Sequence, residues 1–146
     1  MSAESKELVR RYFEAGDRDD LDAWDELCSP EMVLYPGFGE PVHGLAAVKQ
    51  FTAAFHGALS DLYLTVHDLI ADGDRVAARW TAGGRQTGPL GGPGGVIPPT
   101  GKEIAMNGMS IVRVAGGKIV EERVQPDIMG VMQQLGVIPQ PQGAST

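Results

Sequence analysis

The order of apolar and polar positions along the chain predicts helices first, then strands, and one more helix at the end. Residues 5–15 repeat apolar side chains at the spacing of an amphipathic helix, which Gly16 and the acidic run after it end. A shorter helix is expected over residues 21–29, and a third over residues 44–59. The last helix follows Asp127, where apolar residues again recur at helical spacing.

Strand patterns fill the chain between these helices. A short strand, MVLYP, begins at Met32 and is closed by proline. Residues 62–71 and 75–88 are predicted strands joined by Asp-Gly-Asp, and residues 103–114 and 118–125 are predicted strands joined by Ala-Gly-Gly. Both connections are hairpin signals, so the strands are expected to pair antiparallel.

The segment GPLGGPGGVIPPTGK, residues 88–102, has no periodicity and too much glycine and proline for a helix or a strand. We expect a loop there, and loops of this length in small domains are usually functional lids or disordered. Helices grouped apart from antiparallel strands predict an α+β fold, in which a curved antiparallel sheet carries the helices on its concave face. Such an arrangement can enclose a cone-shaped apolar pocket that suits a small molecule.

Length, charge and cysteine content narrow the class of protein. The 146 residues predict one domain, residues 1–138, and a flexible C-terminal tail, residues 139–146. The formal net charge of −7 argues against nucleic acid or an anionic membrane surface as a partner. The single cysteine, Cys28, excludes an internal disulfide and a cysteine-based metal site, and we expect it in the core. The N-terminal residues have no apolar run of signal-peptide or transmembrane type, so a cytoplasmic location is expected.

Asp127 is the only charged residue from Pro126 to the end of the chain, and it lies between the last predicted strand and the last predicted helix. One hypothesis is a helix N-cap, in which the carboxylate accepts an amide hydrogen bond from the first turn. The other is a general acid and base whose side chain points into an apolar pocket. The residues around it leave both hypotheses open.

Three residues before Asp127 share its strand parity, and they lie on its side of the sheet if no bulge intervenes: Glu121, Arg123 and Gln125. Gln125 can hydrogen-bond a substrate carbonyl or be an ordinary polar strand residue. Arg123 can stabilise an enolate, or it can form a surface ion pair with Glu121 or Asp127.

Other side chains are candidates for the pocket wall. Trp80 shares strand parity with the apolar residues at 76, 78 and 82, so it is either a core residue or a stacking surface for a substrate. Met109, like the other methionines of the late strands and the last helix, offers flexible apolar surface that suits a core or a pocket. The three histidines have no metal-ligand spacing, and His67 lies on a sheet face that can be solvent, interface or pocket.

Five segments resemble, in this order, the SnoaL-like polyketide cyclase family of the NTF2-like superfamily. The most specific pieces are DLIADGDRVAARWTA, the IPPTG turn and the D-x-x-G-x-x-x-Q-L-G ending. The segments cover nearly the whole chain from residue 10 to residue 136, and they are RRYFEAGDRDDLDAWDELCSPEMVLYP, VHGLAAVKQF, LYLTVHDLIADGDRVAARWTAGGRQTG, IPPTGKEI and GGKIVEERVQPDIMGVMQQLG.

The resemblance implies an NTF2-like cone with an internal pocket, no metal or organic cofactor, and a homodimer or homotetramer that pairs through the outer sheet face. It also implies that Asp127 is the general acid/base of an intramolecular aldol ring closure. Tyr35 and Gln86 stand where family members commonly have histidines that line the pocket, and Arg123 stands where an aromatic residue is usual. The residues expected to bind the substrate are Tyr35, Trp80, Gln86, Met109, Arg123 and Gln125.

The function that the resemblance implies is a cofactor-independent cyclase, of lyase or isomerase type, that closes a ring in a hydrophobic polyketide-type intermediate of antibiotic biosynthesis. Closure would be aldol-type with Asp127, or pericyclic or conjugate in a shaped pocket, with Tyr35 and Gln86 polarising carbonyls. The alternatives are an isomerase, an epoxide-opening enzyme or a cofactor-free hydroxylase on the same fold, and a non-catalytic protein that binds a small ligand.

Overall fold

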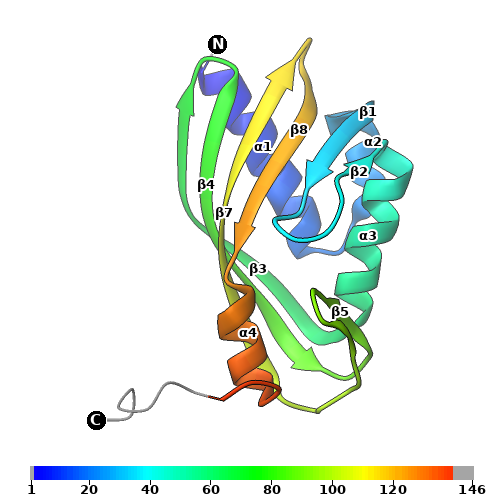
Figure 1. The fold of residues 1–146 in the computed structure, drawn as a ribbon. Coiled ribbons are helices and arrows are strands. Elements are labelled where there is room, and N and C mark those ends of the chain that lie inside the picture. The colour runs from blue at the N-terminus through cyan, green and yellow to red at the C-terminus, as the bar shows by residue number, and fades with distance from the viewer. Residues whose placement is uncertain (1, 140–146) are drawn as a thin grey trace.

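A curved, six-stranded sheet forms the frame of the protein in the computed structural model, which describes residues 2–139 (Figure 1). Its strand order is β2-β1-β8-β7-β4-β3, in which β1 pairs with β8 in parallel and the other neighbours pair antiparallel. The strands are β1 (Cys28–Tyr35), β2 (Val42–His43), β3 (Leu59–Asp72), β4 (Arg75–Gln86), β7 (Glu103–Ala115) and β8 (Lys118–Pro126).

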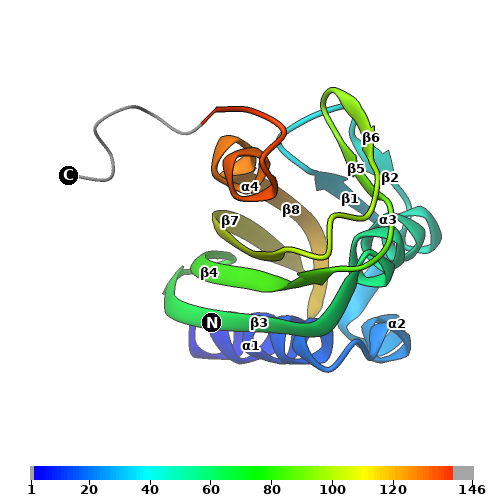
Figure 2. The ribbon, with the colours of Figure 1, turned by 90° about the horizontal axis from the view of Figure 1, so that it is seen from below.

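The helices cover one face and one end of this sheet. The longest, α1 (Ser2–Asp17), packs along β3 and β4, and α3 (Leu45–Gly57) packs against β1. The short α4 (Ile128–Leu135) continues from β8 and packs on β7, at the end of the sheet that faces the viewer in Figure 2. A 3₁₀ turn, η1 (Leu21–Ala23), leads into the single helical turn α2 (Trp24–Leu27). The α+β fold predicted from the sequence is confirmed.

The hydrophobic core lies between α1, α2, α3 and the concave face of the sheet. The set of even-numbered β4 residues that the strand pattern assigned to the core is buried, and Trp80 is among them. Aromatic side chains from α1 and α2 complete this core, since Tyr12 stacks on Trp24 with ring centroids 4.5 Å apart. The largest buried apolar members are Tyr12, Phe13, Trp24, Leu27, Met32, Trp80 and Ile119.

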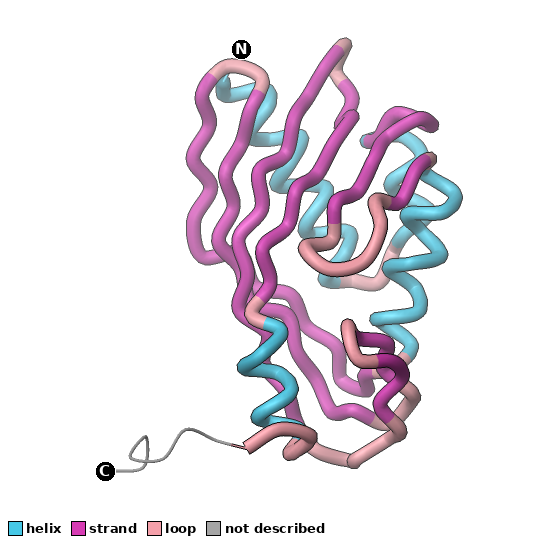
Figure 3. Tube along the Cα trace, in the orientation of Figure 1, coloured by secondary structure: helices cyan, strands magenta, loops and turns pink. Residues whose placement is uncertain are grey.

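Residues 88–102 contain more structure than the sequence predicts. The expectation of a plain loop is wrong for β5 (Leu90–Gly92) and β6 (Gly95–Ile97), which pair as a small antiparallel hairpin (Figure 3). Glycine and proline carry no strand pattern, so this hairpin depends on contacts from elsewhere in the chain. Those contacts include the packing of Leu90 in a hydrophobic cluster and hydrogen bonds from one buried side chain, Gln86, described below.

Strand β1 also begins earlier than the pattern indicates. Cys28, expected in the second helix, is instead the first residue of β1, where it pairs with Ile119 of β8. Its predicted place in the core is confirmed, and burial, with the nearby Glu122 carboxyl, raises the pKa of its thiol to about 12. A thiol with such a pKa is a poor nucleophile at neutral pH, so Cys28 acts as a core residue.

No helix within residues 2–139 combines the length and the apolar character needed to cross a bilayer. Residues 140–146, most of the predicted C-terminal tail, lie outside the described residues, so the tail remains a prediction.

Candidate functional site

An apolar cavity of about 460 Å³ lies at the end of the sheet where α3, α4 and the β5–β6 hairpin meet. Helix α3 contributes Phe51 and Phe55 to its wall, the hairpin contributes Leu90, and α4 contributes Val131 and Met132. The volume falls in the range of roughly 300–1,000 Å³ that is common for small-molecule sites. The cavity therefore matches the cone-shaped pocket expected from the fold.

A second cavity of about 130 Å³ lies deeper in the core and continues the first. The residues that border both are Leu34, Thr52, Phe55, Met106 and Val124. Unlike the outer cavity, the inner one has ionisable groups in its wall, including Tyr12, His56 and Glu122. Among the described residues that line either cavity, Glu122 is the one carboxylic acid.

Glu122 is held in a chain of buried hydrogen bonds. The Tyr12 hydroxyl donates to one carboxyl oxygen at 2.6 Å, and the Ser110 hydroxyl donates to the other at 2.7 Å. The Trp80 indole N–H donates in turn to the Ser110 oxygen at 2.9 Å. All four side chains are buried, and Glu122 has no ion-pair partner within residues 2–139. The carboxyl is therefore supported by neutral donors alone.

The parts of this network come from distant elements, and close packing positions them. The Trp24 indole N–H donates to the backbone oxygen of Tyr12 at 3.1 Å, which fixes the helix turn that carries the phenol. On the opposite strand, the Trp80 ring lies flat against Gly108, where a Cβ atom would come within 2.4 Å of it. A glycine at position 108 is therefore what allows the indole to reach Ser110.

Burial determines the electrostatics of the network. It raises the pKa of Glu122 above the ordinary value of 4.5, while the hydrogen bonds from Tyr12 and Ser110 act in the opposite direction. Burial, and then the charge of Glu122, raise the pKa of Tyr12 well above 10.0. The remaining titratable neighbour is Cys28, and His56 lies on the same inner cavity. Glu122 thus holds its proton to a higher pH than an exposed glutamate does.

A β-bulge explains why Glu122 faces the core. Arg113 of β7 pairs with Glu121 and Val114 pairs with Ile119, which leaves Val120 as an extra residue in β8. The extra residue reverses the alternation of faces, so Ile119 and Glu122 both point inward although their numbers differ in parity. Sequence reasoning missed Glu122, yet one signal was present. Two consecutive glutamates in a central strand must face opposite sides, so one of them faces the core.

Three of the expected substrate-binding residues lie on the outer face, and the bulge in β8 places two of them, Arg123 and Gln125, there. Arg123 and Gln125 share one face of β8, as the strand parity predicts, but this face is turned away from the helices. Arg123 pairs with Glu121 at 3.0 Å and lies 3.9 Å from the ring centre of Tyr35. Met109 of β7 lies opposite Gln125 and is also exposed. None of these side chains lines either cavity described within residues 2–139.

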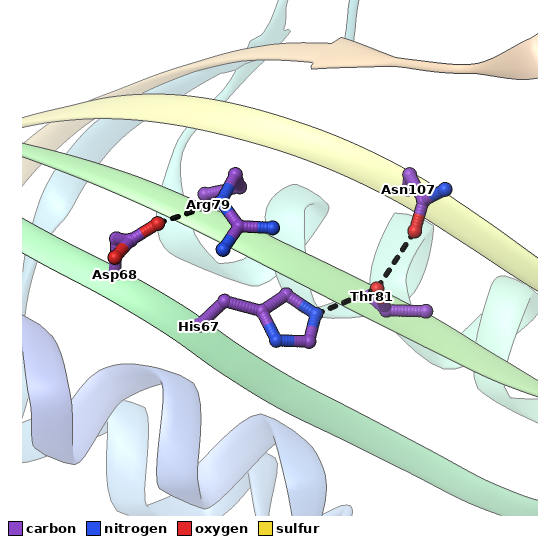
Figure 4. A network of polar contacts seen from close by, with 5 residues as sticks. All are labelled: His67, Asp68, Arg79, Thr81 and Asn107. Atoms are coloured by element: carbon purple, nitrogen blue, oxygen red, sulfur yellow. Dashed lines mark hydrogen bonds and ion pairs between the residues drawn. The ribbon is translucent and has the colours of Figure 1, made fainter.

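Tyr35 stands at the end of β1 between two cavity residues, Leu34 and Pro36, but its own ring packs under Arg123. Trp80, by contrast, is a core residue that also lies in the wall of the inner cavity, and its role as a stacking surface stays a prediction. The side chains on the outer face form their own polar network: His67 bonds to Thr81, which donates to Asn107 (Figure 4). His67 is exposed on this face and lines neither the outer nor the inner cavity.

Gln86 supports the cavity wall from behind. It is completely buried, and its amide nitrogen lies 3.1 Å from the carbonyl oxygens of Gly88, Ile97 and Pro98. Its amide oxygen accepts hydrogen bonds from the backbone N–H and the hydroxyl of Thr100, at 3.0 and 2.7 Å. The IPPTG turn therefore wraps around Gln86, which leaves this side chain no free donor for a substrate and anchors the hairpin to β4.

Asp127 caps α4 in this structure. Its carboxylate accepts a hydrogen bond from the Gly130 backbone N–H at 2.9 Å, and it is exposed. A Cβ atom at position 130 would lie 2.3 Å from the carboxylate, so the glycine makes room for this cap. Pro126 and Ile128 line the outer cavity, whereas the side chain of Asp127 does not. The acid/base role of Asp127 stays a prediction.

The other residues of the D-x-x-G-x-x-x-Q-L-G ending also hold α4 in place. The Gln134 amide bonds to both the backbone N–H and the backbone oxygen of Ala105 in β7, at 2.7 and 3.0 Å. Leu135 is buried, and Gly136 ends the helix with a left-handed conformation, φ 78°. This motif therefore fixes the helix that closes one side of the cavity.

Comparison with known proteins identifies the class that this fold and cavity define. The family described as SnoaL-like polyketide cyclase matches residues 6–135, and solved structures with an NTF2-like fold superpose on the chain. The protein belongs to the SnoaL-like polyketide cyclase family.

Three known proteins are similar to this chain over most of its length. Aklanonic acid methyl ester cyclase DnrD of Streptomyces peucetius is 30% identical over 134 residues, which cover 89% of each chain. IdmH of Streptomyces antibioticus, whose suggested activity is polyketide cyclisation, superposes with a TM-score of 0.72 at 31% identity, over 90% of this chain and 98% of that one. AclR of Streptomyces galilaeus, whose suggested activity is hydroxylation, superposes with a TM-score of 0.81 at 28% identity, over 95% and 100%.

The cap formed by Asp127 predicts a stability effect. Asp127→Ala removes the acceptor for the Gly130 N–H, so we expect the free energy of unfolding to fall by about 0.5–2 kcal/mol. Asp127→Asn is the matched control, because asparagine caps helices about as well as aspartate. Urea unfolding of the three proteins measures both values. An alanine variant as stable as the parent would contradict the cap.

The buried carboxyl predicts a pH effect on stability. Because the pKa of Glu122 is higher in the folded protein than in the unfolded chain, the folded state binds this proton more tightly. Its contribution to stability is fully present below the unfolded pKa and is lost as the pH rises through the folded pKa. Glu122→Gln lacks this loss, so its stability relative to the parent should increase as the pH rises above about 4.5. Chemical unfolding at a series of pH values measures the difference.

The control for the pH series is Glu121→Gln, which removes a carboxyl from the outer face of the same strand and should keep the parent's pH dependence. A constant difference between Glu122→Gln and the parent across the series would show that the buried carboxyl does not titrate as its burial requires.

Proposed function

We propose that this protein is a cyclase that closes a ring in a polyketide-type biosynthetic intermediate. The observation that carries the proposal is the large apolar cavity with a small inner extension, in a chain whose relatives at about 30% identity include polyketide cyclases. An elongated hydrophobic molecule fits such a shape, with its bulk between α3, α4 and the hairpin. A polar end group would then reach the inner extension.

The cavity would act on the reaction mainly through shape. An enclosed wall holds a flexible substrate in a bent conformation that brings the reacting carbons together. The substrate then loses its conformational entropy on binding rather than in the reaction step. Apolar walls also exclude water, which would otherwise compete for reactive carbonyl groups. A pericyclic or conjugate closure needs little more than this.

An aldol closure additionally needs a group that moves a proton. If Asp127 has this role, as the resemblance implies, its carboxylate must leave the Gly130 N–H and turn inward between Pro126 and Ile128, which border the cavity. No metal or organic cofactor is part of the proposal, because the aldol reaction exchanges only a proton and consumes no other reagent.

The direct test is turnover of a polyketide probe. Aklanonic acid methyl ester, named in two of the relatives, is the first choice, and simpler polyketide-chain esters extend the series. Mass spectrometry of the products separates the candidate activities. Ring closure conserves the mass of the substrate, whereas hydroxylation, suggested by the similarity to AclR, adds an oxygen atom. Binding of every probe without any product would contradict an enzymatic function.

Blocking the cavity should abolish turnover. Thr52 of α3 borders both cavities, so Thr52→Trp fills the passage between them, and we expect the catalytic efficiency to fall by about 100-fold or more. Ala53→Trp is the matched control, because residue 53 is exposed on the same helix and lines neither cavity. Steady-state kinetics on the active probe gives both values. Full activity in Thr52→Trp would place the reaction outside the cavity.

We also infer that two copies pair through the outer face of the sheet. No helix within residues 2–139 covers this face, and it exposes the apolar side chains Tyr63, Met109 and Ile111 beside the polar network of Figure 4. Exposed apolar side chains grouped on a flat sheet are typical of an interface. A second copy of the chain is the occupant that the resemblance implies.

The oligomeric state tests this pairing. Light scattering after size-exclusion chromatography should give the mass of a dimer or tetramer, and Ile111→Asp should shift the mass toward one chain because it buries a charge in the interface. Val96→Asp is the control, since residue 96 is also an exposed apolar residue but lies on the hairpin. A parent protein with the mass of one chain would overturn the inference.

A further inference from the structure

We propose that Tyr12 and Glu122 form the proton-exchange site of this protein, at the inner end of the cavity, with the Tyr12 hydroxyl as the group that contacts a substrate oxygen. The proposal rests on the proposed cyclase function and assigns to it a pair of residues that lie far apart in the sequence, on α1 and β8. It provides an acid and base that need not move into the cavity, because both residues already line it.

The position of the pair suits the polar end of a substrate. A molecule in the outer cavity meets the inner one across Thr52, Met106 and Val124, and beyond them lie the Tyr12 hydroxyl and the Glu122 carboxyl. The rest of the described wall is mainly apolar, and its other titratable group, His56, pairs with Asp19 at 2.6 Å. A carbonyl oxygen in this place would find its hydrogen-bond donor at Tyr12, since a buried carbonyl without a donor costs free energy.

The arrangement of donors indicates more than a structural role. A buried carboxylate without a cation is costly, and a pair of apolar side chains would pack the same space without this cost. Here the acid is instead provided with two hydroxyl donors, one on each oxygen, at 2.6 and 2.7 Å. These hydroxyls satisfy the ionised form, while burial, the larger of the two effects, favours the neutral form and raises the pKa of Glu122.

The protonation state of Glu122 determines what Tyr12 can do. When the carboxyl is ionised, it accepts the phenol hydrogen. When the carboxyl is neutral and its hydrogen lies between the same two oxygens, the Tyr12 oxygen becomes the acceptor, and the phenol hydrogen must turn elsewhere. Tyr12 lines the inner cavity, so a substrate oxygen bound there can accept this hydrogen. Protonation of Glu122 therefore converts Tyr12 into a donor toward a bound substrate.

The chemistry balances for an aldol closure. The Glu122 carboxylate accepts a proton from the carbon beside a substrate carbonyl, and the electron pair of that C–H bond forms a new bond to a second carbonyl carbon. The π electrons of the second carbonyl move onto its oxygen, which takes a proton from Tyr12. Glu122 returns to Tyr12 the proton that it received. One C–H bond and one C–O π bond break, one C–C and one O–H bond form, and no other reagent is consumed.

Ser110 is a positioning residue in this scheme. It donates to the second carboxyl oxygen of Glu122 and accepts from the Trp80 indole, so it holds the carboxyl in one orientation and favours its ionised form. Ser110→Ala removes a hydrogen bond to the charged form, which raises the pKa of Glu122 further. A reaction rate that depends on ionised Glu122 should then rise only at a higher pH in Ser110→Ala than in the parent. Both proteins are folded over this pH range.

The experiment compares Glu122→Gln, Tyr12→Phe, Ser110→Ala and Asp127→Asn with the parent, and uses Glu121→Gln as the matched control. Two reactions of aklanonic acid methyl ester are followed: ring closure by mass spectrometry, and exchange of the hydrogens beside its carbonyl groups in D₂O by proton NMR. We expect Glu122→Gln and Tyr12→Phe to slow both reactions by about 10²–10⁴-fold, the usual effect of a general acid or base. Glu121→Gln should react like the parent.

Binding of the probe and thermal unfolding are measured on every variant, so that loss of the fold is distinguished from loss of proton transfer. If Glu122→Gln does not fold, the pH profile of Ser110→Ala provides the same test through the pKa of Glu122. If the acid limb of the pH profile of Ser110→Ala coincides with that of the parent, the proposal is overturned.

The two reactions also separate this proposal from the proposed function. Hydrogen exchange without ring closure would support the proton-exchange site and contradict cyclisation of this substrate. Ring closure that Glu122→Gln and Tyr12→Phe leave unchanged would support the cyclase and overturn the site, as would a loss confined to Asp127→Asn. Neither reaction in the parent would overturn both.

Discussion

The extra residue in β8, Val120, determines which side chains this protein presents to its interior. Without it, strict alternation from Ile119 would direct Arg123 and Gln125 into the core and Glu122 outward. With it, an acid and an apolar residue, Glu122 and Val124, face the cavities, and the charged and amide side chains face the outside. A single unpaired residue in a ladder thus decides both the chemistry of the interior and the polarity of the outer sheet face.

The motifs that carry the resemblance to the family mainly support the elements around the cavity. The side-chain amide of Gln86 uses both its nitrogen and its oxygen in hydrogen bonds to the turn that follows the β5–β6 hairpin. The Gln134 amide bonds α4 to β7. These hydrogen bonds add to the packing of the two walls, whose residues Leu90, Val131 and Leu135 belong to one buried hydrophobic cluster.

The interior combines features that stability alone does not favour. An open cavity forgoes contacts, and a carboxyl supported only by hydroxyls from Tyr12 and Ser110 is held in a neutral, apolar setting. Local departures from good packing and good solvation are what functional sites generally require, because a reactive group must be desolvated and a substrate needs space. The two departures lie together here, because Glu122 is in the wall of the inner cavity.

The sequence by itself determined the α+β class, the two hairpins and the inward face of β4 with Trp80, because periodicity and turn residues act locally. Only the tertiary structure decided the hairpin within the glycine-rich segment, which depends on Gln86, and the inward turn of Glu122, which depends on a bulge set by pairing with β7. Register and buried polar contacts join distant segments, so no local pattern encodes them.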